Sequence, residues 1–531
     1  MLVENLNNIR TKQAVDYTGR NRIIRNVFSS WLGYSVYLVA GFILPRLIDR
    51  NLGKDSLGIW DFCWSIVGYF GLTQLGISQS IDRYVAKYRI RKDPAGLNQS
   101  VSSVFLFQCF SSAVVFVLTI VISIWLPKMF GDRLGTNVDE AKWIIIFLGY
   151  SIGITQLFNV FHGVITGCHR WDIHNALNAG TYGIIVVAMI SSLLAGGGLR
   201  SLALAYLLIT TIDLSARAVI AHRICPELKI RLREANFAMM RKQLYFGGKT
   251  FVPGMVEVLL KQTVNLLIVG SLGAAALALF SRPVALVRHC GVIVSKFGNV
   301  LMPVASSLTA VNKEEELRLL FIKAVKSGSL ICIPLMFGLA IFGEEILYVW
   351  MGRDYANSAL ITVLSIGSIA SLIQAPIYSI LIGLNRHGVA GAAKMAGSAA
   401  SIGLAILNFK ILETGLVGCA LSVGLPATAV DGIFLPIYAC RKLSIPLRQF
   451  IKESFMKPFI LNLPLIVFLM VVKWGFQSLS WQGLATAAVG GSLISLTVYW
   501  IYALPRDLKQ KLLRRLKSNS DRIQPAAHAS D

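Results

Sequence analysis

The chain has 531 residues, of which 55% are hydrophobic and only 15% are charged, whereas soluble proteins contain about 25% charged residues. Its mean hydropathy is +0.63, and this value together with many long apolar runs excludes an ordinary soluble protein and indicates a polytopic membrane protein. A formal net charge of +24 would suggest nucleic-acid binding in a soluble protein. Here the basic residues cluster in alternate loops, so we expect no nucleic-acid partner.

Residues 1–26 are polar and basic, without an apolar segment and cleavage site, so we expect no cleavable signal peptide. Apolar runs then recur along the chain, and about 20 helical residues suffice to cross ~30 Å of hydrocarbon. The pattern predicts an all-α polytopic membrane protein with about fourteen transmembrane helices. Their ranges are 27–47, 57–80, 101–126, 143–166, 173–195, 200–221, 250–272, 274–300, 327–343, 358–384, 389–411, 415–439, 458–474 and 483–504.

The distribution of basic residues predicts the orientation of these helices. If the N-terminus is cytoplasmic, most of the 51 lysines and arginines fall in cytoplasmic segments, such as the linker 222–249 and the tail after Pro505. This is the bias that the positive-inside rule describes. Because the alternation continues to the end of the chain, we expect an even number of spans and both termini in the cytoplasm.

Two pairs of short matches predict an internal repeat. "NLGKDSLGIW" (51–60) is similar to "SLGAAALALF" (271–280), and "ITGCHR" (165–170) is similar to "LIGLNR" (381–386). Both pairs lie at nearly the same offset, which indicates two six-helix blocks related by an axis along the membrane normal, with substrate between them near the midplane. We predict an N-terminal lobe with its linker (1–235), a C-terminal lobe (236–445), and two further helices with a cytoplasmic tail (446–531).

The predicted helix 274–300 carries unusual charge. Arg282, His289 and Lys296 are seven residues apart and share one face, with Arg288 on its flank. An Arg or Lys in hydrocarbon costs about 2.5–3.5 kcal/mol, so this face must meet water, counter-charges or an anionic ligand. The alternative interpretation is a set of internal salt bridges, with Lys296 extending toward the membrane surface.

Two neighbouring helices carry acid–base pairs at helical spacing. Glu257 and Lys261, followed by Asn265, lie on one face of the helix 250–272; they form either a neutral pair between helices or a polar wall of the same water-filled space. Asp213 and Arg217 form a similar pair near the cytoplasmic end of their helix, and we interpret that pair as structural.

Asp61, beside Trp60 and Trp64 near the outer surface, is either an interfacial residue or a proton or cation site. The eight cysteines are scattered singly, which predicts neither a metal site nor a disulfide framework. The sequence lacks nucleotide-binding, hydrolase and metalloprotease motifs. We therefore expect no catalytic residues and no cofactor, and energy from an H+ or Na+ gradient, the membrane potential or the substrate's own downhill flow.

Several segments resemble bacterial oligosaccharide flippases, the polysaccharide transporter branch of the multidrug/oligosaccharidyl-lipid/polysaccharide exporter superfamily. "LGKDSLGIWDFCWSIVGYFGLTQLGISQSIDRYVAKY" (52–88) is similar to the second-helix signature of that family. "LFSRPVALVRHCGVIVSKFGNVLMPVASSL" (279–308), "VWMGRDYA" (349–356) and "LIGLNRHG" (381–388) are similar to its second-half segments.

The resemblance implies a two-lobed fold that moves an undecaprenyl-pyrophosphate-linked oligosaccharide to the outer leaflet of the bacterial inner membrane by alternating access, for export of a surface polysaccharide. It implies that Asp61, Arg282, Arg288 and Lys296 line the cavity. Arginine forks bind phosphate oxygens well. The sequence thus predicts substrate binding at Arg282, Arg288, Lys296, Lys261 and His289, and ion coupling at Glu257 or Asp61.

The expected partners are the lipid-linked oligosaccharide, the bilayer, and a polysaccharide polymerase and glycosyltransferases of the same pathway. One alternative is a multidrug or cation antiporter of the same superfamily, which a basic cavity disfavours. Another is a membrane-embedded polysaccharide polymerase or ligase, which would need a larger outer loop than any in this sequence.

Overall fold

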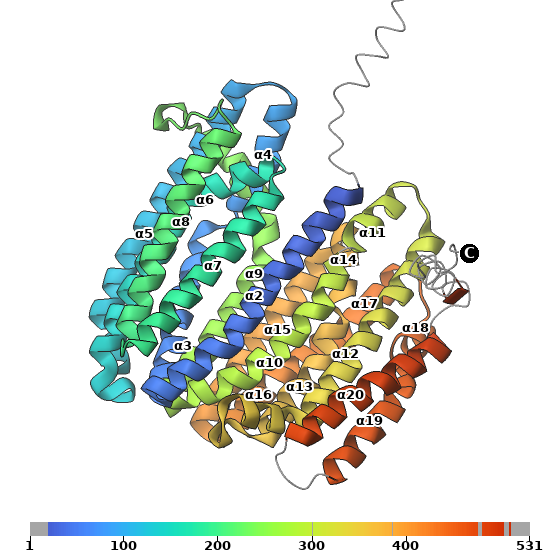
Figure 1. Ribbon diagram of the computed structural model, residues 1–531. Coiled ribbons are helices and arrows are strands. Elements are labelled where there is room, and N and C mark those ends of the chain that lie inside the picture. Colours follow the sequence, from blue (N-terminus) through green and yellow to red (C-terminus); the bar gives the residue numbers. More distant parts are fainter. Residues whose placement is uncertain (1–19, 300, 385, 476–480, 504–508, 511–531) are drawn as a thin grey trace, which may run out of the picture. The chain divides into compact units, whose positions relative to one another are not determined.

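The computed structural model describes residues 20–299, 301–384, 386–475, 481–503 and 509–510. These residues fold into helices and include no β-strand, which confirms the predicted all-α class (Figure 1). The chain divides into two compact units. Unit 1 comprises Met1–Ser281 with Phe409–Ile411, and unit 2 comprises Arg282–Asn408 with Leu412–Asp531.

Unit 1 is arranged around the helix α6. This helix packs against α3, α4, α5 and α8, while α2 packs against α7, and α9 packs against α3 and α5. The helix α10 begins in unit 1 and continues into unit 2. The bounds are α2 (Arg20–Leu52), α3 (Lys54–Gly68), η1 (Tyr69–Gln74), α4 (Ser78–Ile90), α5 (Pro94–Leu134), η2 (Gly135–Asn137), α6 (Val138–Gly167), α7 (Trp171–Leu194), α8 (Leu199–Ile224), η3 (Leu232–Glu234), α9 (Phe237–Leu272) and α10 (Ala274–Asn299).

Unit 2 is arranged around the long helix α12. It packs against α13, α14, α19 and α20, and α13 packs in turn against α16, which lies beside α15. The bounds are α11 (Leu301–Ala310), α12 (Glu314–Met351), η4 (Arg353–Tyr355), α13 (Ser358–Ile373), α14 (Ala375–Gly383), α15 (His387–Leu407), η5 (Asn408–Leu412), α16 (Gly415–Ala427), η6 (Thr428–Phe434), α17 (Leu435–Lys442), α18 (Leu447–Ile451), η7 (Lys452–Met456), α19 (Lys457–Gly475), α20 (Trp481–Val498) and η8 (Tyr499–Ala503).

Eleven helical segments of the described residues are long and apolar enough to cross a membrane. They cover twelve of the predicted spans, because the segment Pro94–Gly167 holds both 101–126 and 143–166. The chain is therefore a polytopic membrane protein. The predicted spans 27–47 and 57–80 fall outside these segments, so the total of fourteen stays a prediction.

The predicted span 57–80 is broken into α3, the 3-10 turn η1 and α4. The break ends at Leu75 and Gly76, whose φ values of 47° and 74° are left-handed and cannot continue a helix. Gln156 of α6 donates a hydrogen bond from Nε2 to the carbonyl oxygen of Phe70 at 2.8 Å. A backbone acceptor in the turn is thus satisfied by protein, as a membrane interior requires.

The two Leu-Gly motifs of the predicted repeat have the same backbone conformation. Gly53, before α3, has φ 87° and ψ 168°, and Gly273, before α10, has φ 89° and ψ 174°. Side chains rarely tolerate these angles, so glycine is required at both positions. The six-helix repeat and the predicted lobes stay predictions, since the division into compact units follows packing rather than sequence similarity, and places α9 in unit 1.

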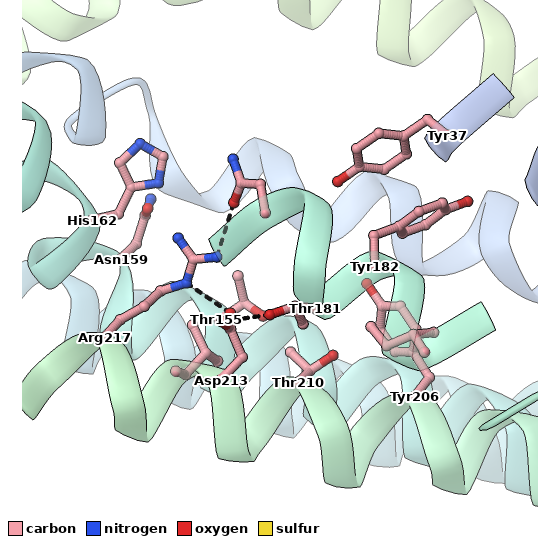
Figure 2. A pocket seen from close by; sticks show the side chains of 13 residues that line it. Tyr37, Thr155, Asn159, His162, Thr181, Tyr182, Tyr206, Thr210, Asp213 and Arg217 are labelled. Atoms are coloured by element: carbon pink, nitrogen blue, oxygen red, sulfur yellow. Dashed lines mark hydrogen bonds and ion pairs between the residues drawn. The ribbon is translucent and has the colours of Figure 1, made fainter. Parts of the chain in front are cut away.

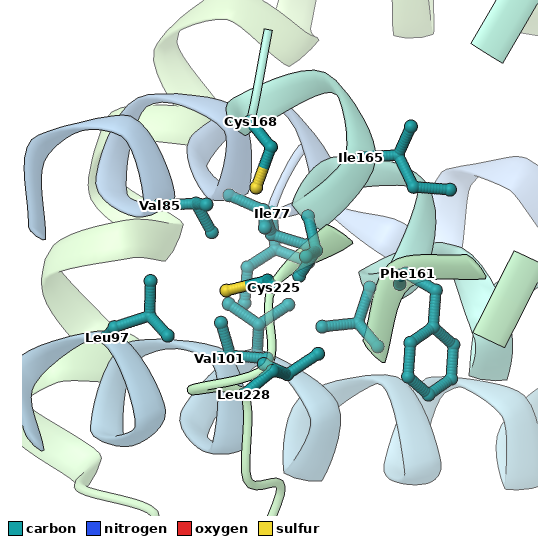
Figure 3. Close-up of a cluster of buried hydrophobic side chains, with 14 residues drawn as sticks. Ile77, Val85, Leu97, Val101, Phe161, Ile165, Cys168, Cys225 and Leu228 are labelled. Carbon is teal, nitrogen blue, oxygen red and sulfur yellow. The ribbon is translucent and has the colours of Figure 1, made fainter. Parts of the chain in front are cut away.

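A cluster of buried, mainly aliphatic side chains lies between α4, α5, α6 and α8 in unit 1 (Figure 3). The helices approach closely here, because a Cβ on Gly163 of α6 would lie 2.6 Å from the Cβ of Ile81 of α4. Two free cysteines lie in this cluster. Its buried members are Ile77, Ile81, Val85, Leu97, Val101, Val104, Val160, Phe161, Val164, Ile165, Cys168, Ala221, Cys225 and Leu228.

Candidate functional site

The predicted cationic face lies on α10, a helix over its whole predicted length apart from residue 300. Arg282 is buried, with 6% of its surface exposed, His289 is half-buried and Arg288 is exposed. The membrane window of this helix is 56% buried, more than that of any other described span. The side chain of Lys296 lies outside the described residues.

The other predicted residues lie in unit 1. Glu257 and Lys261 of α9 are exposed, and Asp61 of α3 is half-buried. The two helices pack together, and Asn265 of α9 donates a hydrogen bond to the Ser65 hydroxyl of α3 at 2.9 Å. Arg282, Arg288 and His289 belong to unit 2. The structure thus brings the predicted ion-coupling residues onto adjacent helices, and a cavity shared with the α10 cations stays a prediction.

Unit 1 also contains a polar cavity of about 300 Å³, which we call the tyrosine cavity. Four helices line it: α2 contributes one tyrosine, and α6, α7 and α8 each contribute several hydroxyl, amide, imidazole or ionised groups. The lining residues are Tyr37 of α2; Thr155, Asn159 and His162 of α6; Asn178, Thr181, Tyr182 and Ile185 of α7; and Tyr206, Thr210, Asp213, Leu214 and Arg217 of α8.

A buried ion pair forms one wall of the tyrosine cavity (Figure 2). Arg217 Nε lies 2.7 Å from Asp213 Oδ2, and the two side chains are only 6% and 10% exposed. Thr181 donates a hydrogen bond to the other carboxylate oxygen at 2.7 Å, and Arg217 Nη2 donates to Asn178 Oδ1 at 2.9 Å. We interpreted this pair from the sequence as structural. In the structure both members are buried, and each makes a further hydrogen bond besides the ion pair.

Two histidines extend the polar network. Asn178 Nδ2 lies 2.8 Å from His174 Nε2, and the rings of His162 and His174 are 4.0 Å apart between centroids. Arg217 Nη1 lies 3.5 Å from His174 Nδ1. The guanidinium group therefore has a polar neighbour at each nitrogen, which holds it in a single position.

Three tyrosine rings gather on the opposite side of the cavity from Arg217 and His162 (Figure 2). Tyr37 and Tyr182 stack with 3.9 Å between ring centroids, and Tyr206 packs edge-on against Trp64 at 5.1 Å. Tyr37 is 41% exposed. The cavity thus has an aromatic side, a charged but internally neutral side, and an accessible rim.

Sequence reasoning found one pair of this site and missed the rest. A signal was present, since polar residues recur at positions 174, 178, 181 and 182 and again at 206, 210, 213 and 217 in otherwise apolar helices. This spacing places each set on one helical face. The contacts between the two sets depend on how α7 packs against α8, which no single helix reveals.

Unit 2 contains a second hollow of a different kind, which we call the apolar groove. It has a volume of about 710 Å³ and lies between α10, α12, α19 and α20. At one end, the Tyr499 hydroxyl lies 2.7 Å from both the Leu330 carbonyl oxygen and the Asn462 amide oxygen. The lining residues are Cys290, Pro334, Leu335, Gly338, Leu339, Phe342, Ile346, Leu465, Leu469, Leu484, Ala487, Ala488, Gly491, Ser492, Ser495, Leu496 and Tyr499.

Comparison with known proteins identifies the family. Residues 48–360 match the family model described as "Polysaccharide biosynthesis protein". The chain belongs to this family. The resemblance to the polysaccharide branch of the exporter superfamily, predicted from the sequence, is thereby confirmed.

Individual relatives agree with this family. The chain is 21% identical over 412 residues to a Shigella flexneri protein named "Putative O-antigen transporter", covering 75% of this chain and 94% of that protein. Its fold is similar to the inward closed conformation of the lipid II flippase MurJ, with a TM-score of 0.67 and 15% identity over 91% of this chain and 98% of that one. It is also similar to an inward-facing MATE transporter of the MOP superfamily, with a TM-score of 0.64 and 15% identity over 78% and 95% of the two chains. The chain therefore has the MOP-superfamily fold.

Proposed function

We propose that this protein is a flippase that moves an undecaprenyl-pyrophosphate-linked oligosaccharide from the cytoplasmic to the outer leaflet of the bacterial inner membrane. It acts by alternating access in the export of a surface polysaccharide, as a transporter and not as an enzyme. The family match supports the pathway, and the names of the O-antigen and lipid II relatives support a lipid-linked glycan.

The observation that carries this proposal is the charge on α10. Its candidate membrane span, Ala274–Val294, includes Arg282 and Arg288 but no acidic residue, and this helix has the most buried apolar stretch of the described spans. Of the two, Arg282 is buried and Arg288 is exposed, and a buried arginine inside a membrane span is kept only where something offsets its desolvation. A pyrophosphate group does so, because guanidinium groups bind phosphate oxygens with two parallel hydrogen bonds.

In this mechanism Arg282 and Arg288 bind the pyrophosphate, and His289 and Lys296 of the same helix contribute to the electrostatic field there. Lys261 of α9 stays a predicted substrate-binding residue. The apolar groove supports the lipid part of the substrate, since its lining of leucine, alanine and glycine side chains suits a polyprenyl chain. An amphipathic substrate thus finds polar and apolar surfaces in one protein.

The energy for directed movement comes from an ion gradient. Glu257, exposed on α9, or Asp61, half-buried on α3, binds and releases H+ or Na+ during the cycle. A membrane potential supplies about 2.3 kcal/mol per charge per 100 mV. Both termini face the cytoplasm, where glycosyltransferases make the substrate, and a polymerase uses it on the other side.

Charge reversal at Arg288 tests the proposal. In cells that make the lipid-linked glycan, Arg288→Glu should abolish its appearance in the outer leaflet, measured as accessibility to an added lectin in spheroplasts. Arg353→Glu is the matched control, because Arg353 is an exposed arginine outside the spans. Arg288→Lys should retain partial transport, since lysine keeps the charge but not the fork.

Translocation that is unimpaired in Arg288→Glu, at equal amounts of folded protein, would remove Arg288 from the mechanism. Resistance to cationic drugs on overexpression, without any effect on the glycan, would favour the multidrug antiporter instead.

A further inference from the structure

The tyrosine cavity has a charge balance that restricts its ligand. Its ionised lining residues are one aspartate and one arginine, and these two are paired with each other at 2.7 Å. The Asp213 carboxylate also accepts a hydrogen bond from Thr181. A carboxylate already neutralised in this way offers little to a metal cation, and a paired guanidinium offers little to a phosphate. The cavity is therefore suited to a neutral ligand.

The lining groups also indicate the chemistry of that ligand. Hydroxyl groups from tyrosine and threonine and amides from asparagine both donate and accept hydrogen bonds, and they surround the cavity on all four helices. The aromatic side formed by Tyr37, Tyr182 and Tyr206 faces the polar side across the cavity (Figure 2). A sugar ring has the matching surfaces, because its rim carries hydroxyl groups and its faces carry C–H groups that pack on aromatic rings.

A purely structural role does not account for the open space. The ion pair and its hydrogen bonds would be equally well satisfied in a filled helix interface, where packing is normally close to crystalline density. Instead about 300 Å³ remains open beside them, at the lower end of the range for small-molecule sites. This volume suits one sugar residue and not a whole oligosaccharide.

We propose that the tyrosine cavity of unit 1 binds a neutral sugar residue of the transported glycan, with the tyrosine rings stacking on the sugar and the polar wall bonding its hydroxyl groups. This inference rests on the proposed function and assigns the glycan a binding site separate from the α10 arginines. The site makes transport selective for the sugar, whereas the α10 arginines would bind any pyrophosphate carrier.

Photo-crosslinking tests where each part of the substrate binds. The photoreactive residue p-benzoylphenylalanine is placed at Tyr182, at Ala488 of the apolar groove, and at Ile184, which lies on α7 but is 60% exposed and does not line the cavity. After irradiation of cells that make the lipid-linked glycan, adducts are identified by mass spectrometry. We expect the Tyr182 probe to attach to the sugar, the Ala488 probe to attach to the polyprenyl chain, and the Ile184 probe to give no glycan adduct.

The outcomes separate the two proposals. A glycolipid adduct at Ala488 without a sugar adduct at Tyr182, nor at a second probe placed at Tyr37, overturns the sugar site and leaves the flippase intact. The absence of glycolipid adducts at all three positions overturns both. An equal yield of sugar adducts at Ile184 also overturns the site, because it would reflect diffuse exposure to the glycan.

Substitution of Tyr182 provides a second readout. Tyr182→Phe keeps the ring and should leave translocation within about twofold of the parent, whereas Tyr182→Ala should lower it about tenfold or more. Ile184→Ala is the matched control on the same helix. Equal translocation by Tyr182→Ala and the parent would overturn the stacking role. Equal losses in Tyr182→Phe and Tyr182→Ala would overturn it too, because phenylalanine keeps the ring.

Discussion

The tyrosine cavity and the apolar groove are two hollows built by opposite means. The cavity, of about 300 Å³, keeps its polar groups in place with an ion pair and a network of side-chain hydrogen bonds. The groove, of about 710 Å³, is lined almost entirely by apolar side chains, and the lining serines can bond within their own helix, as Ser492 does. In a membrane protein the first kind of hollow depends on a few specific bonds, whereas the second depends on shape alone.

The largest expected effect on stability comes from breaking the buried ion pair of the tyrosine cavity. Arg217→Met removes the cation and leaves the Asp213 carboxylate buried without its charge partner, which should lower the free energy of unfolding by about 3–5 kcal/mol. The thermal unfolding temperature of purified protein in detergent measures this. The double variant Asp213→Leu with Arg217→Met should recover most of the loss, and a double variant as unstable as the single one would contradict this explanation.

A single hydroxyl should matter in the cavity and not in the groove. Thr181→Val removes the donor to Asp213 at 2.7 Å and should cost about 1.5–3 kcal/mol, as expected for a hydrogen bond to a charged group. Ser492→Ala removes only a bond to the carbonyl oxygen of Ala488 in its own helix and should change stability by less than about 0.5 kcal/mol. Similar losses of stability in Thr181→Val and Ser492→Ala would show that hydroxyl groups matter equally in the cavity and in the groove.

The helix packing at Gly163, next to the cavity-lining His162, should tolerate an added methyl group less well than the packing at Gly491 of the apolar groove. A Cβ on Gly163 would lie 2.6 Å from the Cβ of Ile81, whereas one on Gly491 would lie 3.0 Å from Cδ1 of Leu465, the movable end of a side chain. We expect Gly163→Ala to cost about 1–3 kcal/mol through overpacking, and Gly491→Ala to be nearly neutral. Denaturation curves of both variants would test this order.

Filling the groove should impair transport without impairing folding. Ala488 lines the groove and is exposed, so Ala488→Trp can occupy the space intended for an apolar chain. We expect translocation of the lipid-linked glycan to fall about tenfold, with an unchanged unfolding temperature. Val489→Trp, at a neighbouring exposed position outside the groove lining, should transport normally. Normal transport by Ala488→Trp would leave the groove without a role.

The sequence predicted those features that one helix determines by itself. Apolar runs of spanning length predicted most of the helices, and the i, i+4 spacing predicted the Asp213–Arg217 pair. The roles of Arg282, Arg288, His289, Lys261, Glu257 and Asp61 stay predictions, as does that of Lys296.

Features built from several helices escaped prediction. The tyrosine cavity combines side chains of α2, α6, α7 and α8. Which of these side chains meet depends on how the helices pack together, and residue spacing within one helix does not reveal it. The groove escaped because each of its leucines and alanines is an ordinary membrane residue. The break between α3 and α4 was not predicted because Gln156, which donates a hydrogen bond to the Phe70 carbonyl oxygen, is 86 positions away in the chain.

Gly53, before α3, and Gly273, before α10, explain why the two Leu-Gly motifs resemble each other in sequence. Gly53 and Gly273 share one backbone shape that other amino acids strongly disfavour. Most neighbouring apolar positions can accept another apolar residue, but these two positions require glycine. Any other residue at either position would therefore strain the backbone where the next helix begins.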